Sequence, residues 1–242
     1  MRNYPVSIFL PIYNFNPGQL VANVKIVHAF VSSEYREFEI VLVDDTSGRE
    51  TKEAIEKAAS LENVRTIRYD NGPSRRENLA ASFLKAKYGI IAFMDIDLST
   101  ELKHLLDITD NINQGYDVVI GSRYKGITPE RETYRLVLSK AYNFALWILF
   151  GSRIGDHTCG FKGFKKDAIS NLIQELGYDY SGRRGWFWDA EMLIRAQKGN
   201  YRVIEIPVKW TRDAESTFSL GRESKLIPYL LSLWFSLVFH RK

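Results

Sequence analysis

The sequence predicts an α/β fold with a mostly parallel central sheet and helices on both of its faces. Short apolar runs rich in β-branched residues alternate with longer segments whose apolar residues recur every three or four positions. This alternation is typical of parallel sheets whose strands are joined by covering helices. With 242 residues, 45% of them hydrophobic, the chain is long enough to bury a sizeable core.

The first half of the chain carries the clearest alternation. Strands are expected at residues 7–13, 39–45, 64–69, 89–95 and 117–121. Helices are expected between them, within residues 18–31, 48–61, 75–88 and 100–115. Because the carboxyl ends of parallel strands lie at one edge of the sheet, a ligand crevice is expected beyond that edge.

The second half is less regular. It predicts a long apolar helix over 134–150, a glycine-rich segment over 155–164, helices near 165–175 and 187–198, and a last strand within 201–210. No linker rich in Pro, Gly or Ser and no internal repeat interrupts it. We therefore expect one catalytic domain over residues 1–221 and a C-terminal amphipathic helix over 222–242.

Charge is divided unevenly along the chain. Residues 1–116 hold 13 Lys and Arg against 16 Asp and Glu, whereas residues 117–242 hold 20 against 13. The basic second half is therefore expected to meet an anionic partner. A single cysteine, Cys159, excludes internal disulfides, and the N-terminal apolar run is too short for a signal peptide. Both features favour a cytoplasmic protein.

Two carboxylates, Asp95 and Asp97, follow the apolar run GIIAF. Residues two apart in a strand point to the same side, so these like charges repel unless a cation lies between them. Mg²⁺ and Mn²⁺ take such oxygen ligands and keep positions open for substrate phosphates. The alternative is a strand-end turn in which the aspartates cap a following helix at Ser99 or Thr100.

Further motifs accompany this pair in a fixed order: PIYN (11–14), VDD (43–45), GSR (121–123), Arg135 with Ser139, CGFK (159–162), FWDAEML (187–193) and EIPVKW (205–210). With them the sequence resembles the family 2 glycosyltransferases of GT-A fold, and more narrowly the dolichyl- or polyprenyl-phosphate hexosyltransferases. The matches extend over most of the chain. The resemblance implies a metal-dependent inverting enzyme that moves glucose or mannose from UDP-glucose or GDP-mannose to dolichyl or polyprenyl phosphate.

The resemblance also implies the site residues. Asp95 and Asp97 would hold Mg²⁺ or Mn²⁺ on the diphosphate, and the catalytic residues would be Asp97, Arg123 and Asp189. Arg123, Arg135 and Ser139 would bind the acceptor phosphate. The residues implied for nucleotide-sugar binding are Pro11, Tyr13, Val43, Asp45, Asp95, Ile96, Asp97, Arg123 and Arg212.

Several of these residues have plainer alternatives. Tyr13 is also typical of a core aromatic residue, and Asp44, beside Asp45, of a turn or helix cap. Arg123, Arg135 and Arg212 would equally suit the surface of a basic protein.

The sequence departs from the family pattern at three places. Phe15 stands where the family often has Glu, DDTS replaces DDGS, and NGPSRREN (71–78) replaces a Gly-Lys-Gly segment. Two interpretations of Arg75 and Arg76 stay open: charge directed at the donor diphosphate, or two solvated arginines at a helix start. The departures leave the donor sugar undecided.

The acceptor determines whether a general base is needed. A phosphate is already an anionic nucleophile, whereas a hydroxyl needs a base, for which Asp189 is the candidate. Asp189 and Glu191 lie two apart on an expected helix and so do not share a face. The alternative function is a GT-A glycosyltransferase that acts on a sugar hydroxyl in glycan or polysaccharide synthesis. A non-catalytic module binding nucleic acid or anionic lipid leaves the paired aspartates unexplained, so no nucleic-acid partner is expected.

Two apolar segments suggest membrane contact. Residues 226–239 would form a helix of about 21 Å, short of the roughly 30 Å hydrocarbon core. Ser232, Ser236 and His240 lie on one stripe of it, and basic residues flank it, which favours a helix in the interface of an anionic membrane. Residues 141–150 are a second candidate. Core packing and a dimer contact are the alternatives; otherwise the protein is expected to be peripheral, on the cytoplasmic face of a membrane.

Overall fold

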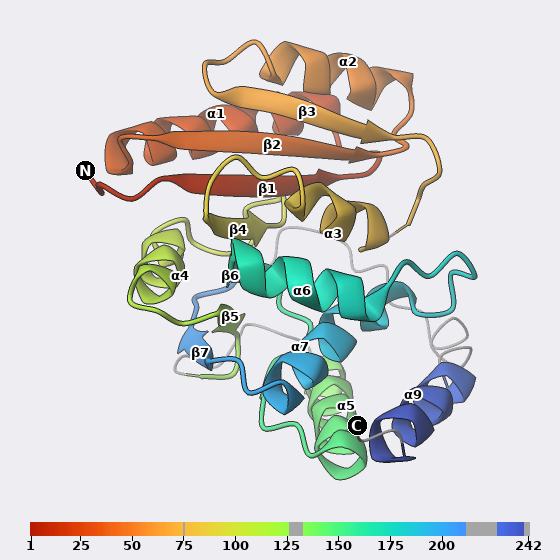
Figure 1. Ribbon diagram of the computed structural model, residues 1–242. Coiled ribbons are helices and arrows are strands. Elements are labelled where there is room, and N and C mark those ends of the chain that lie inside the picture. Colours follow the sequence, from red (N-terminus) through yellow and green to blue (C-terminus); the bar gives the residue numbers. More distant parts are fainter. Residues whose placement is uncertain (75, 126–132, 212–226, 240–242) are drawn as a thin grey trace.

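The computed structural model describes residues 1–74, 76–125, 133–211 and 227–239, without the side chains at 133–135, 227, 238 and 239 (Figure 1). One seven-stranded sheet, with strand order β3-β2-β1-β4-β6-β5-β7, runs through it. The strands are β1 (Val6–Ile12), β2 (Phe38–Asp45), β3 (Val64–Tyr69), β4 (Ile90–Met94), β5 (Val118–Ser122), β6 (Phe161–Lys165) and β7 (Val203–Pro207).

Most strand pairs are parallel, as predicted. β1 pairs in parallel with β2 and β4, β2 with β3, and β5 with β7. β6 is antiparallel to both β4 and β5, and the sequence did not predict this strand. It lies in the glycine-rich segment, where Gly163 permits close packing: a β-carbon there would stand 2.2 Å from Cγ2 of Ile108.

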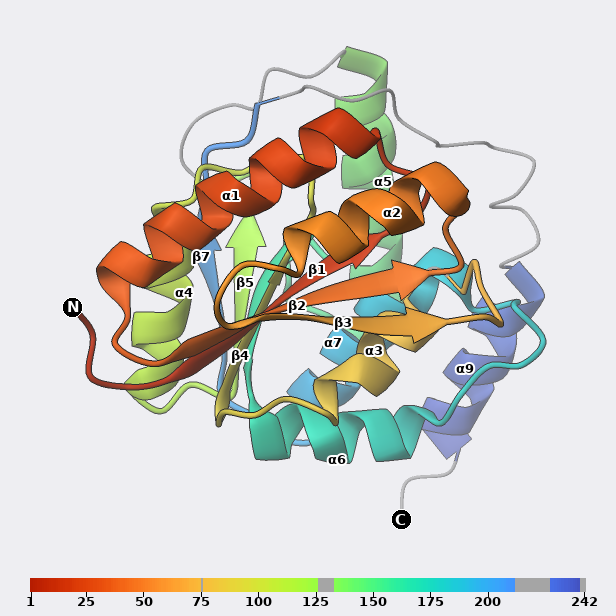
Figure 2. The ribbon, with the colours of Figure 1, turned by 90° about the horizontal axis from the view of Figure 1, so that it is seen from above.

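Helices cover both faces of the sheet, as Figure 2 shows from above. α1 (Pro17–Glu34), α2 (Arg49–Ala58) and α4 (His104–Asn113) pack on one face. α3 (Glu77–Phe83), α6 (Lys166–Leu176) and α7 (Trp188–Lys198), which follows the short 3₁₀ helix η1 (Gly185–Phe187), pack on the other. The start of α1 illustrates the local rules: Asn16 accepts a hydrogen bond from the Gln19 amide at 3.0 Å, and Pro17 begins the helix.

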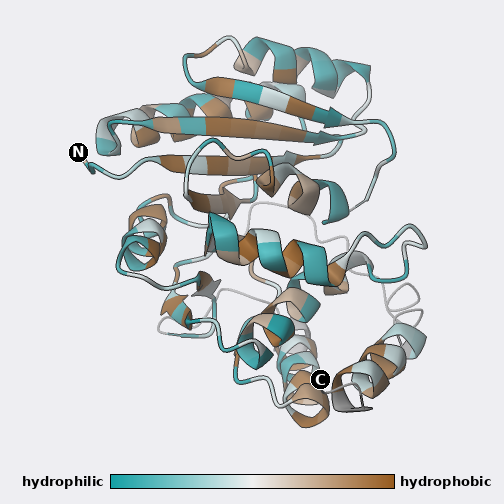
Figure 3. Ribbon diagram, viewed as in Figure 1, coloured by the Kyte–Doolittle hydropathy of each residue, from teal (hydrophilic) through white to brown (hydrophobic). Residues whose placement is uncertain are grey.

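Two further helices, α5 (Thr133–Phe150) and α9 (Ile227–Phe239), lie at one end of the molecule and are rich in apolar residues (Figure 3). They share a small buried cluster with η1 and α7, formed by Leu146, Phe150, Phe187, Ala190, Ile194 and Leu233. Among the described residues, no helix combines the length and the apolar character needed to cross a bilayer.

Candidate active site

Three of the predicted motifs meet at the carboxyl edge of the sheet. β1 pairs with β2 so that Pro11 lies opposite Val43 and Ile12 opposite Asp44. On its other side β1 pairs with β4, which ends at Met94, directly before the Asp95 motif. The PIYN, VDD and DID motifs therefore border one crevice, as their positions at strand ends predicted.

Asp95 lies at the mouth of this crevice. The side chain of Asp95 is 43% exposed. The main chain of Gly160 lies so close to it that a β-carbon at residue 160 would stand 1.8 Å from Oδ2 of Asp95. Desolvation raises the pKa of Asp95. The charge of Arg76 lowers this pKa and the charge of Asp97 raises it, and the net change is an increase. Burial thus disfavours the charged form of Asp95 despite the nearby Arg76, and a bound cation would favour that form.

Asp97 has a structural bond as well. Its Oδ1 accepts a hydrogen bond from the Ser99 amide at 3.0 Å, across a turn in which Leu98 has φ of 55°. The turn alternative is therefore partly correct. The next helix begins only at His104, however, so neither aspartate caps it.

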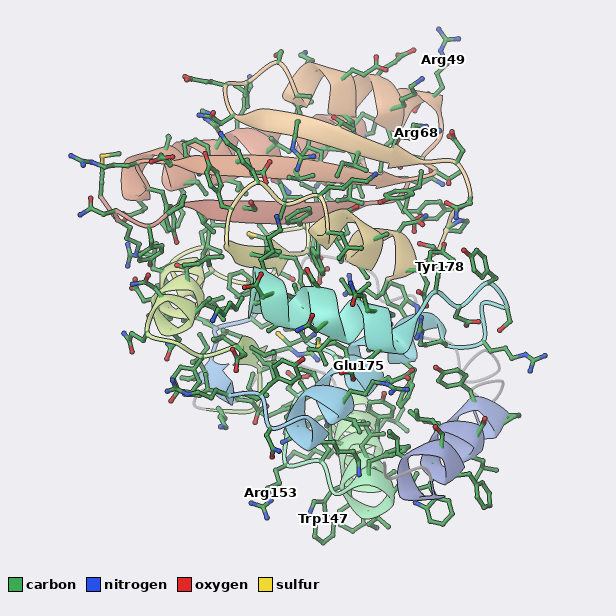
Figure 4. The ribbon with its side chains drawn as sticks, in the orientation of Figure 1. Arg49, Arg68, Trp147, Arg153, Glu175 and Tyr178 are labelled. Carbon is green, nitrogen blue, oxygen red and sulfur yellow. The ribbon has the colours of Figure 1, made fainter. Side chains whose placement is uncertain are left out.

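Asp44 has the turn role that the sequence left open. It is buried, accepts a hydrogen bond from the Ser47 amide at 2.8 Å, and forms an ion pair with Arg68. Figure 4 shows Arg68 at the end of β3, away from the centre of the molecule.

Asp45 holds the loop that replaces the family's Gly-Lys-Gly segment. Its Oδ2 accepts from the Ser74 amide at 2.8 Å, and its Oδ1 accepts from Nδ2 of Asn78 at 2.6 Å. Gly72 lies so close that a β-carbon would stand 2.5 Å from Oδ1 of Asp45. Gly72, Ser74 and Asn78 are thereby held against the end of β2.

A hollow of about 390 Å³ adjoins this loop. The Tyr178 hydroxyl, labelled in Figure 4, donates to Oδ1 of Asn78 at 3.1 Å, which links the hollow to Asp45 through the amide. The residues that line the hollow are Asn71, Pro73, Ser74, Glu77, Tyr178, Asp179, Tyr180, Gly182 and Gly185.

The other residues predicted for the nucleotide differ in exposure. Tyr13 is 51% exposed, so the core-aromatic alternative is wrong. Pro11 is partly buried. Val43 and Ile96 are buried in the two core clusters, which leaves their main chain, not their side chains, for contact with a ligand.

Asp189 lies in a buried charge network that the sequence did not predict. Its Oδ1 accepts a hydrogen bond from Nζ of Lys162 on β6 at 2.9 Å, and its Oδ2 accepts one from Nε of Arg76 at 2.9 Å. Desolvation alone would raise the pKa of Asp189, but the charges of Lys162 and Arg76 outweigh it and hold this pKa below its ordinary value. Arg76 continues to Asp95 at 3.7 Å, so the network reaches the crevice.

This network changes two interpretations. Arg76 is buried, so the solvated-arginine alternative is wrong for it, and Arg75 lies outside the described residues. Glu191 points elsewhere, to Arg195 at 2.8 Å and to the Tyr229 hydroxyl of α9, which confirms that it shares no face with Asp189. Lys162 belongs to the CGFK motif, but nothing in the sequence indicates that its side chain is buried and paired with Asp189.

Arg123 is more restrained than predicted. Its Nε and Nη2 donate to the two carboxylate oxygens of buried Asp156 at 2.8 and 2.7 Å, and Nη2 also donates to Thr158 at 2.9 Å. Arg123 is buried, so the surface alternative is wrong for it, and its contact with the acceptor phosphate stays a prediction. The sequence did not indicate Asp156 as its partner.

The other predicted acceptor residues are less well defined. Ser139 lies on α5, where its carbonyl accepts a hydrogen bond from Nδ2 of Asn143 at 2.9 Å. Arg135 lies on the same helix, but its side chain is outside the described part of the chain, as is Arg212 entirely.

Residues 7–173 match the model of the family described as glycosyl transferase family 2. The chain belongs to this family. A relative, glycosyltransferase AglD of Haloferax volcanii, is 31% identical over 226 residues, which cover 90% of this chain and 35% of AglD. Dolichyl-phosphate beta-glucosyltransferase of Saccharomyces cerevisiae is 27% identical over 241 residues, covering 90% of this chain and 70% of that enzyme. The chain thus spans about a third of the first relative and 70% of the second.

Solved structures confirm the α/β GT-A fold of this family 2 chain. Glucosyl-3-phosphoglycerate synthase from Mycobacterium tuberculosis, in complex with Mn²⁺, UDP and glucosyl-3-phosphoglycerate, matches with a TM-score of 0.67 and 13% identity, covering 96% of this chain and 79% of that one. The same enzyme with Mg²⁺ and UDP matches with a TM-score of 0.64 over 96% and 79% of the two chains. At this level of identity the likeness establishes the fold.

The crevice of the family 2 chain fits a divalent ion that is shared with a substrate. Among the described residues, no group of three or more His, Cys, Asp or Glu side chains could hold a metal by itself. Asp95 and Asp97 instead offer two carboxylates, both partly exposed. Mg²⁺ is commonly held by one or two carboxylates together with substrate phosphates.

Proposed function

We propose that this chain is an inverting glycosyltransferase that moves glucose or mannose from a nucleotide diphosphate sugar, UDP-glucose or GDP-mannose, to dolichyl or polyprenyl phosphate. The observation that carries the proposal is the pairing of Asp189: its two carboxylate oxygens lie 2.9 Å from the buried cations Arg76 and Lys162. The resemblance to a yeast dolichyl-phosphate beta-glucosyltransferase supports the same acceptor class.

The engagement of Asp189 bears on the acceptor. A hydroxyl acceptor must lose its proton to a nearby base, and a carboxylate paired with Lys162 and Arg76 is a poor one. A lipid phosphate is already an anion and needs only alignment and shielding of charge. Its oxygen attacks the anomeric carbon, the bond to the diphosphate oxygen breaks, and the electron pair leaves with the nucleoside diphosphate, which inverts the anomeric centre.

The donor site is proposed at the crevice, with Asp95 and Asp97 holding Mg²⁺ or Mn²⁺. A bound ion would supply positive charge to the departing diphosphate. Pro11, Tyr13 and Asp45 would lie beside the nucleotide, and the main chain of Val43 and Ile96 would complete its site.

The acceptor phosphate is proposed to bind on the basic second half of the chain. Arg135 and Ser139 of α5 are the proposed contacts, with Arg212 near the phosphates. Arg123 would contribute from its buried pair with Asp156.

The end of the molecule that carries α5 and α9 is proposed to rest on a membrane. Large apolar side chains are exposed there, namely Val137, Leu138, Phe144, Trp147, Ile148, Leu231 and Phe235. Residues 133–154 contain no acidic residue, and Lys140 and Arg153 are exposed among them. In Figure 4, Trp147 and Arg153 project at the same end of the molecule. Aromatic and basic side chains together suit the interface of an anionic membrane, here proposed as a cytoplasmic face.

The proposal is tested by transfer itself. The protein is incubated with polyprenyl phosphate and labelled UDP-glucose or GDP-mannose, with and without a chelator, and the lipid is extracted into organic solvent. We expect label in the organic phase with one of the two donors, lost with the chelator and absent with unphosphorylated polyprenol. Equal labelling of polyprenol, or transfer to a glycan hydroxyl alone, would refute the phosphate acceptor.

A further inference from the structure

Arg76 is held by two aromatic rings and by carboxylates. Its Cζ makes cation–π contacts at 5.2 Å from the ring centroids of both Phe93 and Trp186. Phe93 is buried in the core, whereas Trp186 is 42% exposed. One edge of the guanidinium, through Nε, is fixed to Asp189 at 2.9 Å. The ion pair of Nη2 with Asp95 is longer, at 3.7 Å, beyond hydrogen-bond length.

The tight and the loose contact have different consequences. Asp189 and the two rings set the position of Arg76, since a short charge-assisted bond and cation–π contacts restrict a guanidinium group strongly. The edge toward Asp95 is not held by a hydrogen bond of ordinary length. It therefore faces the crevice as a donor that a ligand oxygen can engage.

The charges around Arg76 match an anionic ligand once a divalent ion is bound. Asp189 pairs with Arg76 and Lys162, Asp95 pairs with Arg76, and the charge of Asp97 acts on Asp95, so these three carboxylates and two cations have a formal net charge of −1. A divalent ion would change this to +1, and the doubly negative diphosphate of a nucleotide sugar would restore −1. Without Arg76 the metal-loaded cluster would be neutral, so the arginine supplies its excess positive charge.

We propose that Arg76 binds the diphosphate of the donor, beside the metal-binding carboxylates, and that Asp189 is the positioning residue that aims it. The inference rests on the proposed function for the identity of the ligand. The inference assigns the contact with the leaving diphosphate to Arg76, which lies in the segment that replaces the family's usual Gly-Lys-Gly. It also gives Trp186 the role of holding the guanidinium through a cation–π contact.

The test measures binding, not turnover. The affinities of UDP and GDP, each with Mg²⁺, are measured by calorimetry for the wild type and for Arg76→Gln, Arg76→Lys and Trp186→Ala. The control is Arg65→Gln, which removes an arginine paired with Glu39 at 2.7 Å near the opposite ends of the strands. Thermal unfolding of each variant reports whether it is folded.

We expect Arg76→Gln to weaken binding of the diphosphate roughly 10- to 100-fold, the range for losing a hydrogen bond to a charged group. Arg76→Lys should fall between it and the wild type, because a lysine keeps the charge but not the planar fork. Trp186→Ala should weaken binding several-fold, and Arg65→Gln should leave it unchanged.

Several results would overturn the inference. A folded Arg76→Gln that binds the diphosphate within about twofold of wild type would show that Arg76 is only structural; if this variant does not fold, wild-type affinity in both Arg76→Lys and Trp186→Ala would show the same. A wild type that binds neither nucleotide would remove the donor proposal and this inference together. Binding that depends on Arg76, without transfer to lipid phosphate, would leave the inference standing and refute only the acceptor.

Discussion

The main chain of Gly160 lies directly against the carboxylate of Asp95, because a β-carbon at residue 160 would stand 1.8 Å from Oδ2. We predict that Gly160→Ala displaces Asp95 and lowers transfer roughly 100-fold, as a misplacement of about 1 Å can do. The measurement is initial rate on folded protein. Gly89→Ala is the matched control, since a β-carbon there would meet nothing within 4 Å. Wild-type rates in Gly160→Ala would contradict the placement of Asp95 in the site.

Asp189→Asn separates a positioning carboxylate from a general base. The variant leaves Lys162 and Arg76 buried without their partner, so we expect a loss of about 3–5 kcal/mol of unfolding free energy. Transfer per folded molecule should fall roughly 10- to 100-fold through misplacement of Arg76.

Glu191→Gln, on the same helix, is the control for Asp189→Asn. Glu191 pairs with Arg195, with the Tyr229 hydroxyl and, at 3.7 Å, with Arg184, and none of these belongs to the network of Asp95, Arg76, Lys162 and Asp189. Its loss should therefore destabilise the protein without changing transfer per folded molecule. A several-thousandfold loss of transfer in folded Asp189→Asn would instead indicate general-base catalysis of a hydroxyl acceptor.

His157 should make the stability of the protein depend on pH. Its ring is buried, with Ser152 Oγ at 2.8 Å and Asn143 Oδ1 at 2.6 Å, and burial together with the charge of Lys162 lowers its pKa from 6.5 to about 4. The unfolded chain therefore binds the proton more readily than the folded one. Stability from this group is complete above pH 6.5 and declines as the pH falls toward 4, by up to about 3 kcal/mol.

The check is urea unfolding at pH 7 and pH 5. The wild type should lose more stability between these values than His157→Gln, which cannot take up the proton. Equal losses in the two proteins would show that His157 is not buried in its neutral form.

The exposed apolar side chains of α5 should mediate membrane binding. Phe144 and Trp147 are stacked with ring centroids 5.6 Å apart, and both are more than half exposed. We expect the double variant Phe144→Ala, Trp147→Ala to bind anionic vesicles about tenfold more weakly or worse in a sedimentation assay. Ile26→Ala, which removes a 51% exposed apolar side chain from α1, is the control. Unchanged sedimentation of the double variant would assign this face to another contact.

The strands, their parallel order and the meeting of three motifs were predictable because each depends on local patterns. Apolar runs define β1, β2 and β4, and parallel pairing then brings Tyr13, Asp45 and Asp95 to one edge. The antiparallel strand β6 was missed because its five residues, Phe161–Lys165, include a glycine and two lysines. The burial of Lys162 depends on a partner that lies elsewhere in the chain.

The charge network could not be predicted for the same reason. Arg76 and Asp189 are separated by 113 positions, and their contact depends on how α7 packs against the loop before α3. Asp156, which binds Arg123, likewise lies in a segment whose pattern indicated only a loop. Pairings of this kind arise from tertiary packing, which the periodicity of apolar residues in the sequence does not indicate.

The proposed donor site requires a divalent ion shared between Asp95, Asp97 and a nucleotide diphosphate. Asp97→Asn removes charge but keeps an oxygen that can accept the 3.0 Å hydrogen bond from the Ser99 amide, so the turn should survive. The decisive measurement is Mn²⁺ binding followed by electron paramagnetic resonance, with and without UDP or GDP. We predict that one nucleotide tightens Mn²⁺ binding to the wild type at least tenfold and has no such effect on folded Asp97→Asn. Equal Mn²⁺ binding by the two proteins in the presence of the nucleotide would contradict the account.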